Sequence, residues 1–105
     1  MKAIQSLLLR KDNYSYFLRY GKNVLVIDPS EAKPILSIAK KENLFISHIL
    51  NTHHHENHIA GNKEIVETHG SFVIGPEDPL IPCLDKAVSD QDTLDIGPYT
   101  IQVLG

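Results

Sequence analysis

Four histidines cluster near the middle of the chain, in the segment Thr52-His53-His54-His55-Glu56-Asn57-His58. Three of them, His53, His55 and His58, are spaced i, i+2 and i+5, so a loop can turn their imidazoles toward one point. Neutral imidazole binds Zn²⁺ or Fe²⁺ well, and a catalytic zinc site needs about three protein ligands and an open position for water. A bound cation lowers the pKa of that water, which makes hydroxide available near neutral pH. The cluster therefore predicts a metal site that activates water.

The alternative interpretation is a solvated histidine-rich loop, or histidines satisfied by local hydrogen bonds. Metal binding is favoured because histidine-rich tracts usually bind metal. The cluster also directly follows the apolar segment Leu44–Leu50, and α/β sheets place their ligands beyond the carboxyl ends of strands. Of the remaining histidines, His48 is expected to be an ordinary strand residue, and His69 a surface residue at the C-terminus of a helix.

Glycine and proline residues divide the chain into short strands and two helices. The run Val24-Leu25-Val26-Ile27 is typical of a strand covered on both faces. One helix is expected from an N-cap at Ser30 to Lys41, and a second over Asn62–His69, ending at Gly70. The alternation of strands and helices predicts an α/β layer with helices on at least one face. The expected strands are Ala3–Leu9, Tyr14–Tyr20, Asn23–Asp28, Leu44–Leu50, Ser71–Ile74, Thr93–Ile96 and Tyr99–Leu104.

Composition narrows the class of protein. The chain has 105 residues, 42% of them hydrophobic, which suits one globular domain. Its net charge is −3 and its basic residues are scattered, so no nucleic-acid partner is expected. The single cysteine, Cys83, excludes an intramolecular disulfide and fits a reducing compartment. No apolar run approaches the roughly 18 residues of a membrane span, so the predicted location is cytoplasmic, with no membrane partner.

The spacing His53-x-His55-x-Asn57-His58 resembles the His-x-His-x-Asp-His signature of the metallo-β-lactamase superfamily. With Thr52 before it and Gly61-Asn62 after it, the segment is similar to the glyoxalase II version of that signature. Nearly the whole chain takes part in the resemblance, which implies an α/β fold: half of an αββα sandwich, a mixed sheet with helices on one face. Further matches in the same order are Asp12-Asn13-Tyr14, Val26-Ile27-Asp28-Pro29 and Thr93-Leu94-Asp95-Ile96-Gly97.

The resemblance implies a role for each site residue. His53 and His55 would hold a first metal, and Asn57 and His58 a second. Asn57 offers a neutral carbonyl oxygen where the family has a carboxylate, so it is a weak ligand, and one metal site is expected rather than two. Zinc is the expected metal, with iron or manganese as alternatives. Asp28 would steady the histidine loop from behind the ligands, unless it is simply the turn at a strand end.

The resemblance also implies the reaction, hydrolysis of the thioester S-D-lactoylglutathione to D-lactate and glutathione. The family continues beyond the segment equivalent to Leu104-Gly105, so residues 1–105 read as one truncated domain. An inner sheet face of Leu7, Leu9, Val24, Val26 and Ile49 is then expected to lack its cover. A homodimer or a complementing half would supply that cover. The alternative is a catalytically inert metal-binding or interaction module left by truncation.

Overall fold

The computed structural model describes residues 3–10, 13–29, 31–51, 61–79, 81, 83–89 and 91–102. Most of the predicted elements are present within a residue or two of their expected bounds. The helices are α1 (Ala32–Glu42) and α3 (Asn62–His69). The strands are β1 (Ala3–Arg10), β2 (Asn13–Tyr20), β3 (Asn23–Ile27), β4 (Phe45–Leu50), β5 (Phe72–Pro76), β6 (Lys86–Val88), β7 (Thr93–Ile96) and β8 (Tyr99–Gln102).

The described strands form a mixed sheet in the order β1-β2-β3-β4-β5-β6 and a separate hairpin, β7-β8. The pairs β1–β2 and β2–β3 are antiparallel, whereas the pairs β3–β4, β4–β5 and β5–β6 are parallel. Gly21, at a φ of 60°, allows the tight turn between β2 and β3. Parallel neighbours need a crossover, and α1 and α3 provide the crossovers on either side of β4. The predicted mixed sheet is therefore confirmed.

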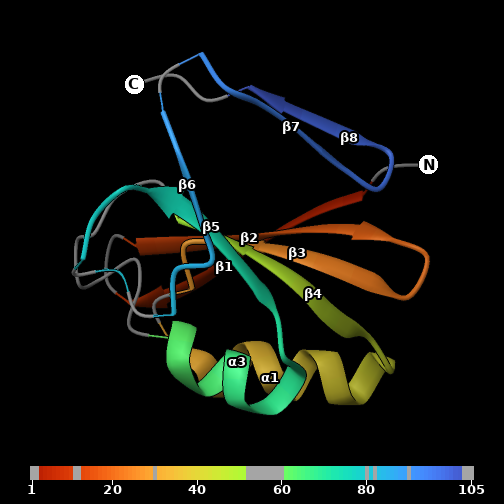
Figure 1. Ribbon diagram of the computed structural model, residues 1–105. Helices are drawn as coiled ribbons and strands as arrows, with labels where there is room; N and C mark the ends of the chain where they lie inside the picture. The colour runs from red at the N-terminus through yellow and green to blue at the C-terminus, as the bar shows by residue number, and fades with distance from the viewer. Residues whose placement is uncertain are drawn as a thin grey trace.

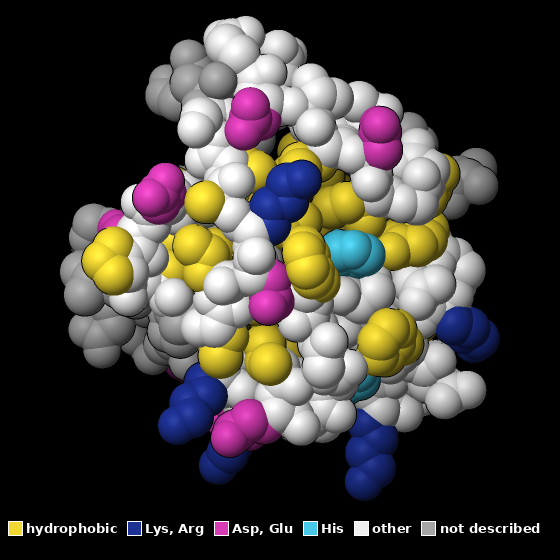
Figure 2. Space-filling model, in the orientation of Figure 1, with side chains coloured by type: hydrophobic (Ala, Val, Ile, Leu, Met, Phe, Trp, Pro, Cys, Tyr) yellow, Lys and Arg dark blue, Asp and Glu magenta, His cyan; other side chains and the backbone are white. Residues whose placement is uncertain are grey.

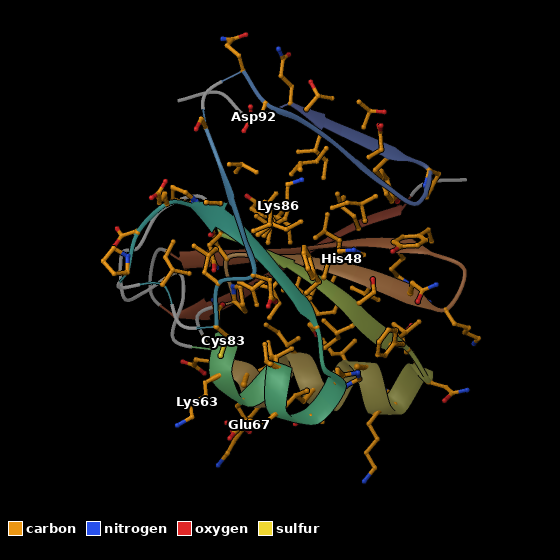
Figure 3. The ribbon with its side chains drawn as sticks, viewed as in Figure 1. His48, Lys63, Glu67, Cys83, Lys86 and Asp92 are labelled. Carbon is orange, nitrogen blue, oxygen red and sulfur yellow. The ribbon has the colours of Figure 1, made fainter. Side chains whose placement is uncertain are left out.

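Both helices cover the same face of this sheet, and the β7-β8 hairpin lies on its opposite side (Figure 1). On α3, Ile65 is buried, whereas Lys63 and Glu67 are exposed and point away from the sheet (Figure 3). Neither described helix has the length and apolar character that a membrane span requires. The buried residues between sheet and helices are Phe17, Val24, Val26, Ala32, Ile35, Ala39, Leu44, Ile46, Ile49, Ile65, Val73 and Ile81.

The expected orientation of the sheet residues is wrong for Val24, Val26 and Ile49. All three are fully buried on the helix-covered face. The run Val24–Ile27 is apolar at every position and β4 ends in the apolar pair Ile49-Leu50, so neither segment reveals which alternate residues meet the helices. Leu7 and Leu9 lie in β1, and their side chains fall outside the described part of the structure.

The opposite face is made by the other alternate residues and is partly covered by the hairpin. Leu94 and Ile96 of the hairpin are buried with Leu25, Leu50, Ile74 and Val88. The hydroxyl of Tyr99 donates a hydrogen bond to the carbonyl oxygen of Arg19 (2.7 Å), which ties β8 to β2. Hydrophobic side chains remain visible on the surface beside the hairpin (Figure 2). Tyr16 and Phe72 are 41% and 44% exposed.

The start of α1 differs slightly from the prediction. The N-cap is Glu31, in an extended conformation with no side-chain hydrogen bond to the helix, rather than Ser30, which lies outside the described residues. Pro34 falls in the first turn, where a missing N–H costs nothing. At the C-terminus, Asn43 adopts the left-handed conformation and its N–H caps the carbonyl oxygens of Ala39 and Lys40.

His69 is the last residue of α3, as predicted, but it is only partly exposed and its side chain is hydrogen-bonded within the fold. Its Nδ1 accepts a hydrogen bond from the backbone N–H of Ile46 (3.2 Å), and the Ser71 hydroxyl donates to the Ile46 carbonyl oxygen (2.5 Å). Both side chains, which stand just before the start of β5 at Phe72, therefore bind the backbone of β4 at Ile46. Because Nδ1 can accept only when it carries no proton, the fold requires a neutral imidazole. Partial burial lowers the pKa of His69 in the same direction.

We expect the stability of the fold to fall as the pH drops from about 7.5 to about 5.5, through the ordinary histidine pKa of about 6.5. The pKa of His69 is lower in the folded than in the unfolded chain, so the unfolded state takes up protons first and is favoured at acidic pH. His69→Gln keeps an acceptor for Ile46 but cannot be protonated, and should reduce the loss. The measurement is the thermal midpoint of both proteins across this range.

His48 also has a pKa lowered by burial, so His69→Gln should remove only part of the pH dependence. Equal slopes of midpoint against pH for the two proteins would contradict the role assigned to His69.

Candidate functional site

The carboxyl ends of β3 and β4 lie side by side at one edge of the sheet. Ile27 and Leu50, the last residues of the two strands, are paired in the parallel register. The next residue of each strand, Asp28 and Asn51, therefore leaves the sheet at the same place. Ligand sites of parallel sheets form beyond this edge. The segment that carries the histidines follows Asn51 directly, so it begins at the expected edge of the sheet.

Asp28 is the one predicted site residue within the described part of the chain. It is buried, and its N–H donates to the carbonyl oxygen of Leu50 (2.9 Å). Its φ of 52° lies in the left-handed region, which aspartate tolerates better than most residues. Asp28 thus makes the turn at the end of β3 that the sequence left open as an alternative. Its role in steadying the histidine loop stays a prediction.

The other predicted site residues, His53, His55, Asn57 and His58, lie in the segment 52–60, outside the described residues. Their roles as metal ligands stay predictions. Within the described ranges there is no group of three or more His, Cys, Asp or Glu side chains placed to hold a metal.

The structure does describe both ends of the histidine segment. Asn51 precedes it, and its N–H donates to the carbonyl oxygen of Ile74 in β5 (2.8 Å). Gly61 follows it, and its N–H donates to the carbonyl oxygen of Pro29 (2.9 Å). A Cβ at Gly61 would lie 2.9 Å from that oxygen, which is why a residue without a side chain stands there. The segment is therefore anchored on β5 at one end and beside the end of β3 at the other.

A pair of side chains joins these two ends. The amide nitrogen of Asn62 donates to Oδ1 of Asn51 (2.6 Å), and the amide nitrogen of Asn51 donates to Oδ1 of Asn62 (3.3 Å). Both residues are buried, at 2% and 0% exposure. The sequence indicates Asn62 only as part of the Gly61-Asn62 match and does not indicate Asn51, because an asparagine beside a loop ordinarily signals only a turn.

His48 is a strand residue, as predicted. Its Nδ1 is 2.8 Å from the hydroxyl oxygen of Ser47 and 3.5 Å from that of Tyr20. Burial lowers its pKa, and its ring packs edge-on against Phe72 at 6.3 Å between centroids. The side chain lies in the middle of the sheet, between the hairpin and the helices (Figure 3). These contacts indicate a packing role.

Cys83, the single cysteine, is free and exposed. Its φ of 63° shows that it occupies a turn.

Curated relatives match most or all of this chain. It is 46% identical over 93 residues to the hydroxyacylglutathione hydrolase of Pelagibacter ubique (strain HTCC1062), covering 85% of this chain and 39% of the relative. It is 37% identical over 107 residues to the enzyme of the same name from Aliivibrio salmonicida (strain LFI1238), covering 100% of this chain and 42% of the relative. The chain thus spans about 40% of the length of these relatives.

A solved structure supports the fold. The BLEG-1 B3 metallo-beta-lactamase superposes with a TM-score of 0.82 over 95% of this chain and 59% of its own, at 22% sequence identity. At that identity the likeness bears on the fold alone. The family profile described as "Metallo-beta-lactamase superfamily" matches residues 10–96, which include both described helices and the histidine segment. This chain therefore belongs to the metallo-beta-lactamase superfamily.

Proposed function

We propose that this chain is the metal-binding part of a hydroxyacylglutathione hydrolase, which hydrolyses the thioester S-D-lactoylglutathione to D-lactate and glutathione. The observation that carries the proposal is the 46% identity to a relative of that name, over a stretch that covers 85% of this chain. The arrangement of the sheet supports it, because the histidine segment starts at the carboxyl edge where β3 and β4 end together.

The superfamily implies a bound metal, and the residues of this chain suit one. We propose zinc, with iron or manganese as alternatives, held by the imidazoles of His53, His55 and His58. Asn57 contributes at most a neutral oxygen, which favours one site over two. When bound, the ion would activate water for attack near neutral pH. The residues behind the loop, Asp28 among them, would hold its backbone at the sheet edge.

A second candidate function is a catalytically inert metal-binding or interaction module. Asn57 favours this candidate, because an uncharged ligand does less than a carboxylate to offset the charge of a second dication.

We further propose that the sheet face around the exposed side chains of Tyr16 and Phe72 is covered by a second copy of this chain or by a complementing half. The proposed compartment is the cytoplasm, since a single free cysteine fits a reducing environment.

The test is an assay of thioester hydrolysis with the zinc-loaded chain, its Asn57→Asp variant and its His53→Ala variant as a control. Because the chain spans about 40% of the length of its relatives, each protein is assayed alone and together with the remaining part of the Pelagibacter ubique relative. We expect hydrolysis of S-D-lactoylglutathione by the complemented chain, a higher rate with Asn57→Asp because a carboxylate strengthens the second site, and none above background with His53→Ala. Hydrolysis absent from both complemented proteins, despite near-stoichiometric zinc, would favour the inert module.

A further inference from the structure

The buried amide pair described above stands at the base of the histidine segment. Asn51 is the last described residue before it, and Asn62 is the first residue of α3 just after it. The two side chains exchange hydrogen bonds of 2.6 and 3.3 Å. Such an exchange requires a donor and an acceptor on each partner, which among side chains of this size the carboxamide of asparagine provides. The pair thus holds together the two residues that flank the segment 52–61.

Each member of the pair is itself held in place. Asn51 is bound through its N–H to Ile74, and a Cβ on the neighbouring Gly75 would lie 3.3 Å from the Asn51 side chain, so β5 packs closely against it. Asn62 begins a helix whose preceding residue, Gly61, is bound to Pro29. On one side, the pair is bound to the end of β4 and to its neighbour β5. On the other side, it is bound to the start of α3 and the residue that follows Asp28 after β3. A hydrogen-bonded polar pair in a buried site favours one arrangement over others, because an arrangement without these bonds would leave buried polar atoms without these partners.

We propose that the Asn51–Asn62 pair is a positioning device for the metal ligands of the loop it closes. The inference rests on the proposed function, since it assumes that the histidines of this loop bind a metal. Ligands bind more tightly when the backbone that carries them is held in the bound geometry beforehand. Groups that orient metal ligands without touching the metal typically change affinity by roughly 10- to 100-fold when they are removed.

The test is the dissociation constant for zinc, measured by titration of the metal-free chain with a zinc salt, for Asn51→Ala, Asn62→Ala and the double variant. We expect each single variant to bind zinc roughly 10- to 100-fold more weakly. We expect the double variant to bind zinc about as weakly as either single variant, well short of the product of the two single fold-changes, because the two amides act as one unit.

Ser71→Ala is the matched control. It also removes a buried side-chain hydrogen bond to β4, but at the amino end of that strand, where Ser71 donates to Ile46. Its thermal midpoint should fall as those of the asparagine variants do, whereas its zinc affinity should equal that of the wild type. A role confined to stability would give the same zinc affinity for all folded variants.

Asn62→Asp keeps the shape of the side chain but loses the donor of the 2.6 Å bond. It replaces Asn62→Ala in the zinc titration if the alanine variant does not fold. Wild-type affinity in any folded variant of the pair would overturn the inference while leaving the proposed function intact. Weakening by Ser71→Ala to the same extent would also overturn it. Failure of the wild-type chain to bind zinc would overturn both the inference and the proposed function.

Discussion

Replacement of His53 or His55 by alanine should remove the bound metal from this chain. Each substitution deletes one of about three imidazole ligands, and two imidazoles with water hold a dication far less tightly than three. The wild-type chain, purified and separated by size, is expected to carry near-stoichiometric zinc or iron. Both variants are expected to carry well below one equivalent, as measured by mass spectrometry of the metal content.

His48→Gln is the control for this experiment. His48 is the same type of residue and lies on β4, the strand that leads to the histidine segment, but its Nδ1 is engaged with Ser47 and Tyr20. The variant should keep its metal. Metal retained by both His53→Ala and His55→Ala would contradict the ligand assignment, and a wild-type chain without metal would mean that the signature no longer binds one.

The largest expected effect on stability is that of Ile49→Ala, at about 2–5 kcal/mol in the free energy of unfolding. Ile49 is fully buried in the layer between the sheet and the two helices. It lies on β4, the strand between the two crossover helices, so truncation of its side chain leaves a cavity in that layer. The measurement is equilibrium unfolding in urea, followed by circular dichroism.

Two further variants set the scale for Ile49→Ala. Ile49→Val removes one methylene at the same site and should cost about 0.5–1.5 kcal/mol. Phe45→Ala removes a larger side chain from the same strand, but Phe45 is 46% exposed, so its loss should cost less than that of Ile49. A cost for Ile49→Ala no greater than that for Phe45→Ala would contradict the assignment of Ile49 to the core.

The sequence by itself determined the elements and the place of the site. The apolar run Val24–Ile27 is a strand, and the segment Asn62–His69 is a helix that ends at Gly70 in the left-handed conformation. These features depend on neighbouring residues, which the sequence shows directly. The histidine spacing likewise pointed to one superfamily, and residues 10–96 match that superfamily.

The tertiary structure decided what depends on residues distant in the chain. Strand β6 was not predicted, because the three residues Lys86–Val88 are too few to show a strand pattern, and the strand is defined by its pairing with β5. The helix-covered face of β3 depends on the side of the sheet on which the crossovers pass, and a strand whose core run is apolar at every position is compatible with either side. His69 bonds Ile46 across 23 residues, and Asn51 bonds Asn62 across 11. Tertiary packing brings these partners together, and no local pattern in the sequence indicates which distant side chains will meet.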